Sequence, residues 1–152
     1  IGQRKWGGKS DNAQIPSVLI AKLEEMLQTE KLEQVFGESP ACLYGEGFGA
    51  RIQKGGGNYI PNGVSFVLFD VKVGAWWLKR EDVLDVAGKL NIQVVPTIGF
   101  GTLNQAIERT IGGFNSQWGR FPAEGIVVRP VVERSTRSGN RIIGKIKTKD
   151  FA

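Results

Sequence analysis

The fold is decided by the stretch Val64-Ser65-Phe66-Val67-Leu68-Phe69-Asp70-Val71-Lys72-Val73. Its valines and phenylalanines favour a strand over the whole of 64–73. Phe66 and Phe69 differ by three positions, so their side chains face opposite sides of that strand. Core packing is the better default for a single phenylalanine. The other ring could stack on a base, an interaction worth roughly 1–3 kcal/mol.

The segments around this strand alternate between helices and further strands. Apolar residues recur at helical spacing over 17–28 and 80–90, and Thr102 caps a third helix that ends near Gly112-Gly113. Strand patterns cover 41–45, 92–98 and 125–129, and a hairpin turn at 137–140 separates 131–134 from 141–147. We therefore expect an α+β fold, mostly antiparallel sheet with inserted helices, in a single domain over 1–152.

The residue types limit the chemistry. The chain has no histidine and one cysteine, Cys42, which excludes internal disulfides, His-based zinc sites and Ser–His–Asp triads. Acid–base or nucleophilic chemistry must then use Lys, Asp, Glu, Tyr or Cys, and a metal would be a hard cation held by carboxylate and phosphate oxygens. We expect Cys42 to be buried in its strand. We expect Trp76-Trp77 to pack against the helix that follows, with contact to substrate as the alternative.

The charge balance favours a polyanionic partner. Lys plus Arg is 20 and Asp plus Glu is 15, giving a net charge of +5. Basic residues are concentrated between Arg129 and Lys149, where Glu133 is the single acid. No stretch reaches the roughly 20 apolar residues of a membrane span, and no signal peptide is visible. We expect a monomeric protein of the reducing cytosol that does not bind membranes.

A glycine-rich run covers residues 44–59 and includes Glu46. Its first glycines, with Asp70 farther on, match the loose dinucleotide fingerprint, but that fingerprint needs a helix directly after the loop. Residues 51–58 have no helical period, so we reject this interpretation. The glycines allow the backbone to approach a ligand closely. The alternative is a flexible hairpin with Glu46 in solvent.

Two further segments place charged groups on short strands. In Glu124-Gly125-Ile126-Val127-Val128 a carboxylate precedes an apolar strand and could face a pocket, although a solvated glutamate is commoner. In the segment 145–149, alternation puts Lys145, Lys147 and Lys149 on one face. Three ammonium groups repel unless an anion such as a triphosphate lies between them. The alternative is an exposed strand face.

The order of these segments is more specific than any one of them. Gly45-Glu46-Gly47, Phe69-Asp70-Val71, Glu124–Val128 and Lys145-Ile146-Lys147 resemble motifs III, IIIa, IV and V of the covalent nucleotidyltransferase superfamily, which contains DNA ligases, RNA ligases and mRNA capping enzymes. The end of the chain, 147–151, is most similar to the RNA ligase branch, including phage enzymes. The resemblance covers essentially the whole chain.

The resemblance implies a lysine nucleophile that attacks the α-phosphate of ATP. The family places it in a Lys-x-x-Gly motif, usually with an aspartate third. Lys5-Trp6-Gly7-Gly8 fits the spacing but lacks the aspartate. We expect the nucleophile upstream of Ile1, so that this chain is truncated and inactive in self-adenylylation, with Lys5 as a weaker candidate. Lys9 stands where the family has an arginine, and a lysine lacks the bidentate fork.

The same resemblance implies a role for each site residue. Glu46 would accept hydrogen bonds from the ribose, and Phe69 would stack on the adenine of ATP or AMP. Lys145 and Lys147 would hold the α-phosphate and Lys9 a phosphate of AMP or of the strand. Glu124 would help to bind Mg²⁺ or Mn²⁺. The RNA ends would contact the side chains of Arg51, Lys54 and Lys149.

Two other functions remain open from the sequence. A DNA ligase or capping-type guanylyltransferase shares these motifs and normally adds an OB-fold domain after motif V. A non-catalytic nucleic-acid-binding module descended from a ligase would also fit a chain with no convincing nucleophile in view. An ATP-dependent RNA ligase that joins 5′-phosphate and 3′-hydroxyl ends fits the motifs best.

Overall fold

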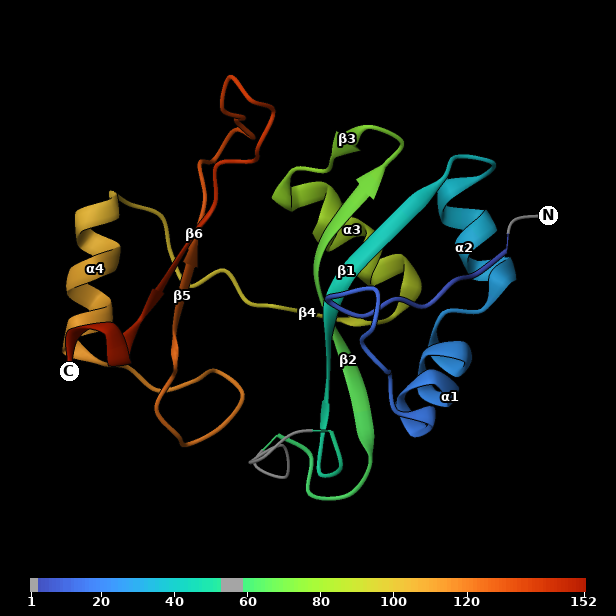
Figure 1. Ribbon diagram of the computed structural model, residues 1–152, viewed down its shortest axis with the longest axis horizontal. Coiled ribbons are helices and arrows are strands. Elements are labelled where there is room, and N and C mark those ends of the chain that lie inside the picture. Colours follow the sequence, from blue (N-terminus) through green and yellow to red (C-terminus); the bar gives the residue numbers. More distant parts are fainter. Residues whose placement is uncertain (1–2, 53–58) are drawn as a thin grey trace. The chain divides into compact units, whose positions relative to one another are not determined.

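The computed structural model describes residues 3–52 and 59–152 (Figure 1). The chain divides into two compact units, Ile1–Val95 and Pro96–Ala152, and each is described by itself. Both contain helices and antiparallel strands, which confirms the α+β class. Within the described ranges no helix has the length and hydrophobicity needed to cross a membrane.

The first unit is built on a sheet whose central strand is β2 (Val64–Val73), with the bounds that the sequence predicts. β1 (Ala41–Gly49) pairs antiparallel with one edge of β2. β3 (Trp76–Trp77) and β4 (Gln93–Val94) pair with the other edge, β4 in the parallel direction. β1 is longer than predicted, because pairing continues through Glu46 to Gly49. The predicted strand at 92–98 is wrong beyond Val95: the structure has a strand over Gln93–Val94, and the Val95 N–H donates the last bond, to the Leu68 carbonyl oxygen at 3.0 Å.

Three helices supply one side of the core: α1 (Ser17–Met26), α2 (Thr29–Phe36) and α3 (Arg80–Leu90). α3 has the predicted bounds, and acids in its first turn with Lys89 in its last complement the helix dipole. α2 was not predicted. The buried cluster joins residues of α1, β2 and α3 with Ile92: Leu19, Leu23, Leu27, Phe66, Leu68, Val71, Val83, Val86, Ala87 and Leu90.

The register between β1 and β2 divides the sheet into two faces. Gly45, which is paired with Leu68, and Gly47, paired with Phe66, lie on the face that carries the core. Because side chains alternate along a strand, the even-numbered residues of β1 lie on the opposite face. We call this opposite face the second face. It holds Cys42, Tyr44, Glu46 and Phe48 of β1, with their partners Lys72, Asp70, Val67 and Ser65 of β2.

The second unit is an antiparallel hairpin packed against one helix. β5 (Gly125–Val128) pairs with β6 (Gly144–Lys147), and a short 3-10 helix (Thr148–Phe151) follows. α4 (Leu103–Gly112) lies along this hairpin (Figure 1). Its start was predicted correctly: the Thr102 hydroxyl accepts from the Gln105 N–H, and the Gln105 side chain accepts from the Thr102 N–H.

The connection between β5 and β6 differs from the prediction. Residues 131–134 form no strand, and β6 pairs with β5 instead. The predicted turn does form, and a bridge between Ser135 and Arg141 closes it. The Glu133 carboxylate accepts from Arg141 Nε at 2.9 Å and lies 3.6 Å from Arg129 Nη1. These ion pairs join the two sides of the connection together with a backbone bond from the Ile142 N–H to the Arg134 carbonyl oxygen at 2.9 Å.

Candidate functional site

The structure brings Glu46 and Phe69 to the same face of the sheet. The register of β1 and β2 shifts between Tyr44 and Gly45, so Phe69 and Asp70 together oppose Tyr44. Glu46 opposes Val67, and side chains alternate along a strand, so Phe69, two residues after Val67, lies on the second face with Glu46. The bulge adds Asp70 to this face, so Phe69 and Asp70 both lie next to Tyr44, while Glu46 follows two residues along β1. Phe69 is half-buried and Glu46 is exposed.

The glycines beside Glu46 serve packing on the other face. A Cβ added at Gly45 would collide with the Val67 carbonyl oxygen and the Phe66 ring, and one added at Gly47 would collide with Leu19. The core therefore requires glycine at Gly45, where the obstacle includes backbone, whereas a Cβ at Gly47 would require the Leu19 side chain to shift. Glu46 lies between these two glycines on a strand that packs closely against its neighbours. Packing against the core is sufficient to explain glycine at these positions, and the close approach of a ligand to their backbone stays a prediction.

Arg80, at the start of α3, forms hydrogen bonds that hold the bulge in place. Its Nη1 donates to the carbonyl oxygen of Phe69 at 3.2 Å, and its Nη2 donates to that of Val95. One guanidinium thus ties the bulged residue to the segment that follows β4. Sequence reasoning treated Arg80 as the first residue of a helix, and no sequence pattern indicated its bond to a backbone 11 residues away.

An aromatic pair lies next to Glu46 and Phe69 on the second face. The rings of Tyr44 and Trp77 have centroids 4.9 Å apart, and the Lys72 ammonium lies 5.5 Å from the Trp77 centroid. A hydrogen bond with Cys42, followed by desolvation, raises the pKa of Tyr44 above 10.0. The expectation of a buried Cys42 is wrong, because its side chain is exposed on this face. Trp76 is 79% exposed, so its predicted packing against α3 is wrong as well.

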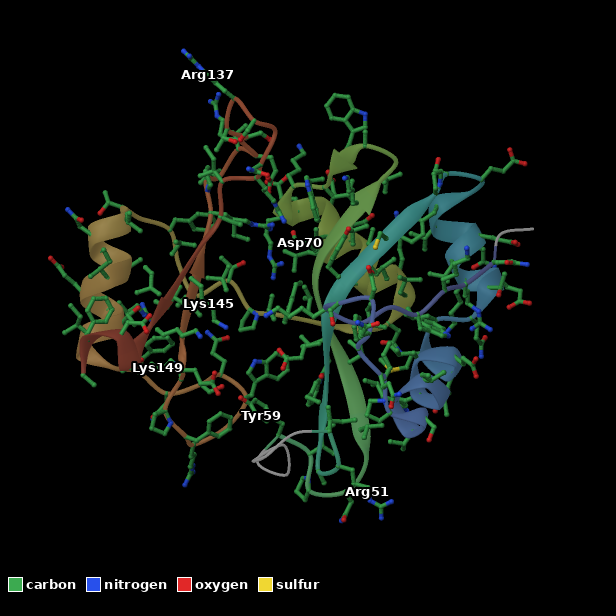
Figure 2. All side chains as sticks on the ribbon, viewed as in Figure 1. Arg51, Tyr59, Asp70, Arg137, Lys145 and Lys149 are labelled. Atoms are coloured by element: carbon green, nitrogen blue, oxygen red, sulfur yellow. The ribbon has the colours of Figure 1, made fainter. Side chains whose placement is uncertain are left out.

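In the second unit, Lys145 and Lys147 share one face of the hairpin. They oppose Val127 and Gly125, whereas the buried Ile126 opposes Ile146 on the other face. Two positions along a strand separate the two Cα atoms by about 6.6 Å. Val127 is exposed on the face that carries the lysines, and α4 covers the opposite face of the hairpin. Lys149 leaves this alternation, because it belongs to the 3-10 helix, as Figure 2 shows.

Glu124 precedes β5 and is exposed. Its carbonyl oxygen accepts from the Thr148 N–H at 2.9 Å, so the residue is fixed beside the end of β6. Gly125 follows because a Cβ there would collide with the Ile146 carbonyl oxygen. The Glu124 backbone is therefore held at the same end of the hairpin as Lys147.

The N-terminal candidates are anchored by their neighbours. Arg4 donates to the carbonyl oxygens of Glu24 at 3.2 Å and Leu27 at 3.0 Å, and Trp6 packs against the core. Lys5 between them is exposed, as is Lys9 in the turn after it. None of the contacts among described residues joins Lys5 or Lys9 to Glu46 or Phe69.

The nucleic-acid candidates are the least defined by the structure. Arg51 is exposed in the turn directly after β1 (Figure 2). Lys54 lies outside the described residues. Farther along the same segment, the Tyr59 and Phe48 rings meet edge to face with centroids 5.9 Å apart. Since Phe48 belongs to the second face, this contact adds a second aromatic group at the other end of β1.

Comparison with known proteins identifies the family of the chain. The family described as RNA ligase matches residues 4–147, from the segment before Lys5 to the last residue of β6. No curated protein matches the chain. The family match covers most of the chain and contains Lys9, Glu46, Phe69, Glu124 and both lysines of β6, and on this basis the chain belongs to the RNA ligase family.

Proposed function

We propose that the protein is an ATP-dependent RNA ligase of the covalent nucleotidyltransferase superfamily, joining 5′-phosphate and 3′-hydroxyl RNA ends. The observation that supports it best is the strand register that puts Phe69 on one face with Glu46: Glu46 opposes Val67, and Phe69 follows Val67 by two residues. A half-buried aromatic ring beside an exposed carboxylate suits a nucleoside, because the ring can stack on the base and the carboxylate can accept from the ribose hydroxyls.

The proposed reaction has three displacements at phosphorus. A lysine amine attacks the α-phosphate of ATP, forming a P–N bond and releasing pyrophosphate. An oxygen of the RNA 5′-phosphate then attacks this AMP phosphorus, so the P–N bond breaks and the lysine is freed. Finally a 3′-hydroxyl attacks the activated 5′-phosphate, closing the phosphodiester and releasing AMP. The first attack needs a neutral amine, and nearby cations favour that form.

Lys145 and Lys147 are our candidates for those cations. They lie on one face of the strand, Lys145 exposed and Lys147 half-buried, and project in the same direction, as two ligands of one phosphate must. We propose that they hold the α-phosphate and offset the charge that develops on its oxygens during each displacement. Lys9 would contact a phosphate of AMP or of the RNA strand. Arg51, Lys54 and Lys149 would contact the RNA backbone.

A divalent cation, Mg²⁺ or Mn²⁺, would be held here by protein and ATP oxygens together. Among the described residues no group of three Asp, Glu, Cys or His side chains could hold a metal. We propose that Glu124 is one carboxylate ligand and that phosphate oxygens of ATP supply others, which is the coordination that Mg²⁺ favours in nucleotide enzymes. The metal would stabilise negative charge at the α-phosphate.

Covalent labelling tests the proposal. The full-length protein, with any residues that precede Ile1, is incubated with α-labelled ATP and Mg²⁺ and separated under denaturing conditions. We expect an acid-labile adduct that pyrophosphate reverses, and we expect Glu124→Ala and Lys145→Ala to abolish it. Lys22→Ala, which removes a lysine paired with Glu25 on α1, is the matched control and should label normally. Normal labelling of the Glu124 or Lys145 variant would refute the site assignment.

A further inference from the structure

The second face carries an aromatic pair that the three displacements do not use. Tyr44 and Trp77 come from different strands, yet their rings lie 4.9 Å apart with an interplanar angle of 44°. Tyr44 remains 42% exposed. Lys72, whose backbone pairs with that of Trp77, holds its ammonium 5.5 Å from the indole centroid. The result is a small aromatic surface with a cation at its edge.

This surface begins where the proposed nucleotide site ends. Tyr44 opposes the bulge that contains Phe69, and it precedes Glu46 by two residues on the same face of β1. Trp77 lies beyond it, on the far edge of β2, where it pairs with Lys72. A base stacked on Tyr44 and Trp77 would thus be a neighbour of a nucleotide held by Phe69 and Glu46.

We propose that Tyr44 and Trp77 stack on a base of the RNA strand beside the nucleotide, which rests on the proposed function of this same face. Stacking on aromatic side chains is the sequence-tolerant means by which proteins hold single-stranded nucleic acid, because every base has a π-face. A cation beside the rings complements the phosphates between successive bases. Lys72 supplies it, and the exposed Lys79 follows Trp77 by two residues.

Trp76 provides a matched control on the same hairpin. Its partner on β2 is Val73, not Lys72, so alternation turns Trp76 to the opposite face of the sheet. Trp76 is also the more accessible ring, at 79% exposure. If RNA stacked on whichever of the two rings is more exposed, RNA affinity would depend on Trp76. If RNA binds on the second face, its affinity depends on Trp77.

The experiment measures binding of a labelled 12-nucleotide single-stranded RNA to the full-length protein by fluorescence anisotropy, without ATP. Trp77→Leu should weaken binding about tenfold, since leucine keeps apolar volume but has no π-face. Trp77→Phe should retain most of the affinity, and Trp76→Leu should bind like wild type. With an abasic strand of the same length, wild type and Trp77→Leu should bind equally.

Unchanged binding by Trp77→Leu, or an equal loss in Trp76→Leu, overturns the inference. If circular dichroism shows that Trp77→Leu is unfolded, Tyr44→Leu takes its place with the same expected loss, because the tyrosine is already 42% exposed. Labelling with ATP is measured separately without RNA. A wild-type protein that forms no adduct refutes the proposed function alone, whereas a Trp77→Leu protein that loses the adduct assigns the pair to the nucleotide pocket and refutes this inference.

Discussion

Replacing Gly45 with alanine tests whether the glycines beside Glu46 serve packing or ligand approach. The new Cβ would collide with the Val67 carbonyl oxygen and the Phe66 ring. The first obstacle is backbone of the central strand, and Phe66 is 8% exposed within the core, so neither can move away freely. Overpacking of this kind costs roughly 1–3 kcal/mol. We expect a loss of about 2–3 kcal/mol, near the top of that range.

The assay is unfolding by urea and by heat, each followed by far-ultraviolet circular dichroism. At about 2–4 °C per kcal/mol for a chain of this size, the melting temperature should fall by about 4–12 °C. Gly88→Ala is the matched control: it lies in α3 with open space around the new Cβ, and it should stabilise by about 0.5–1 kcal/mol. A Gly45→Ala protein of wild-type stability that loses nucleotide binding would show that the glycine is reserved for a ligand.

Three further predictions concern other contacts. Arg80→Ala removes the donors to the carbonyl oxygens of Phe69 and Val95. It should lower the free energy of unfolding in urea by about 1.5–3 kcal/mol and weaken ATP binding. Unchanged ATP affinity would contradict the view that Arg80 holds Phe69 in position. Glu133→Gln removes the charge of a partly buried carboxylate that is paired with Arg141 and Arg129, and it should lower the free energy of unfolding in urea by about 1–3 kcal/mol. Glu25→Gln, in an exposed pair, should lower it by at most about 0.5 kcal/mol. Equal losses in the two variants would contradict the larger contribution of the buried pair. In a Tyr59→Phe variant, absorbance at 295 nm should show Tyr44 titrating above pH 10, because the Cys42 hydrogen bond and desolvation raise its pKa. The folded state then holds the phenol proton more strongly than the unfolded state, so the free energy of unfolding should fall as pH rises above 10. A Tyr44 phenol that titrates below pH 10 would refute the contact with Cys42.

The sequence predicts this fold where one local signal dominates. Val64–Val73 and Arg80–Leu90 have the predicted bounds, because a long β-branched run and an apolar stripe between charged ends are unambiguous. α2 was missed because its eight residues TEKLEQVF carry several charges and no side chain caps its start. The segment 92–98 is as apolar as a strand, but strand pairing is a tertiary property. β2 pairs with Gln93 and Val94 and accepts one further bond from the Val95 N–H.

The site is less accessible to sequence reasoning than the fold. The motifs identify Glu46 and Phe69, and alternation correctly puts Phe69 on the face opposite Phe66. The bulge between Tyr44 and Gly45, which brings Tyr44 and Asp70 to that face as well, is a register shift that no local pattern encodes. The bond from Arg80 to the Phe69 carbonyl oxygen is likewise a long-range contact. Cys42 was expected inside because cysteine is usually buried, whereas its position on the second face leaves it exposed.

The central claim is most directly tested by RNA joining with the full-length protein. A 5′-labelled, 5′-phosphorylated RNA is supplied as a single strand and as a nicked duplex, with Mg²⁺ and with or without ATP. We predict ATP-dependent appearance of AMP-capped RNA, followed by a joined product whose label resists phosphatase, on at least one substrate. RNA that is bound but chemically unchanged on both substrates would contradict the account and favour a non-catalytic RNA-binding module.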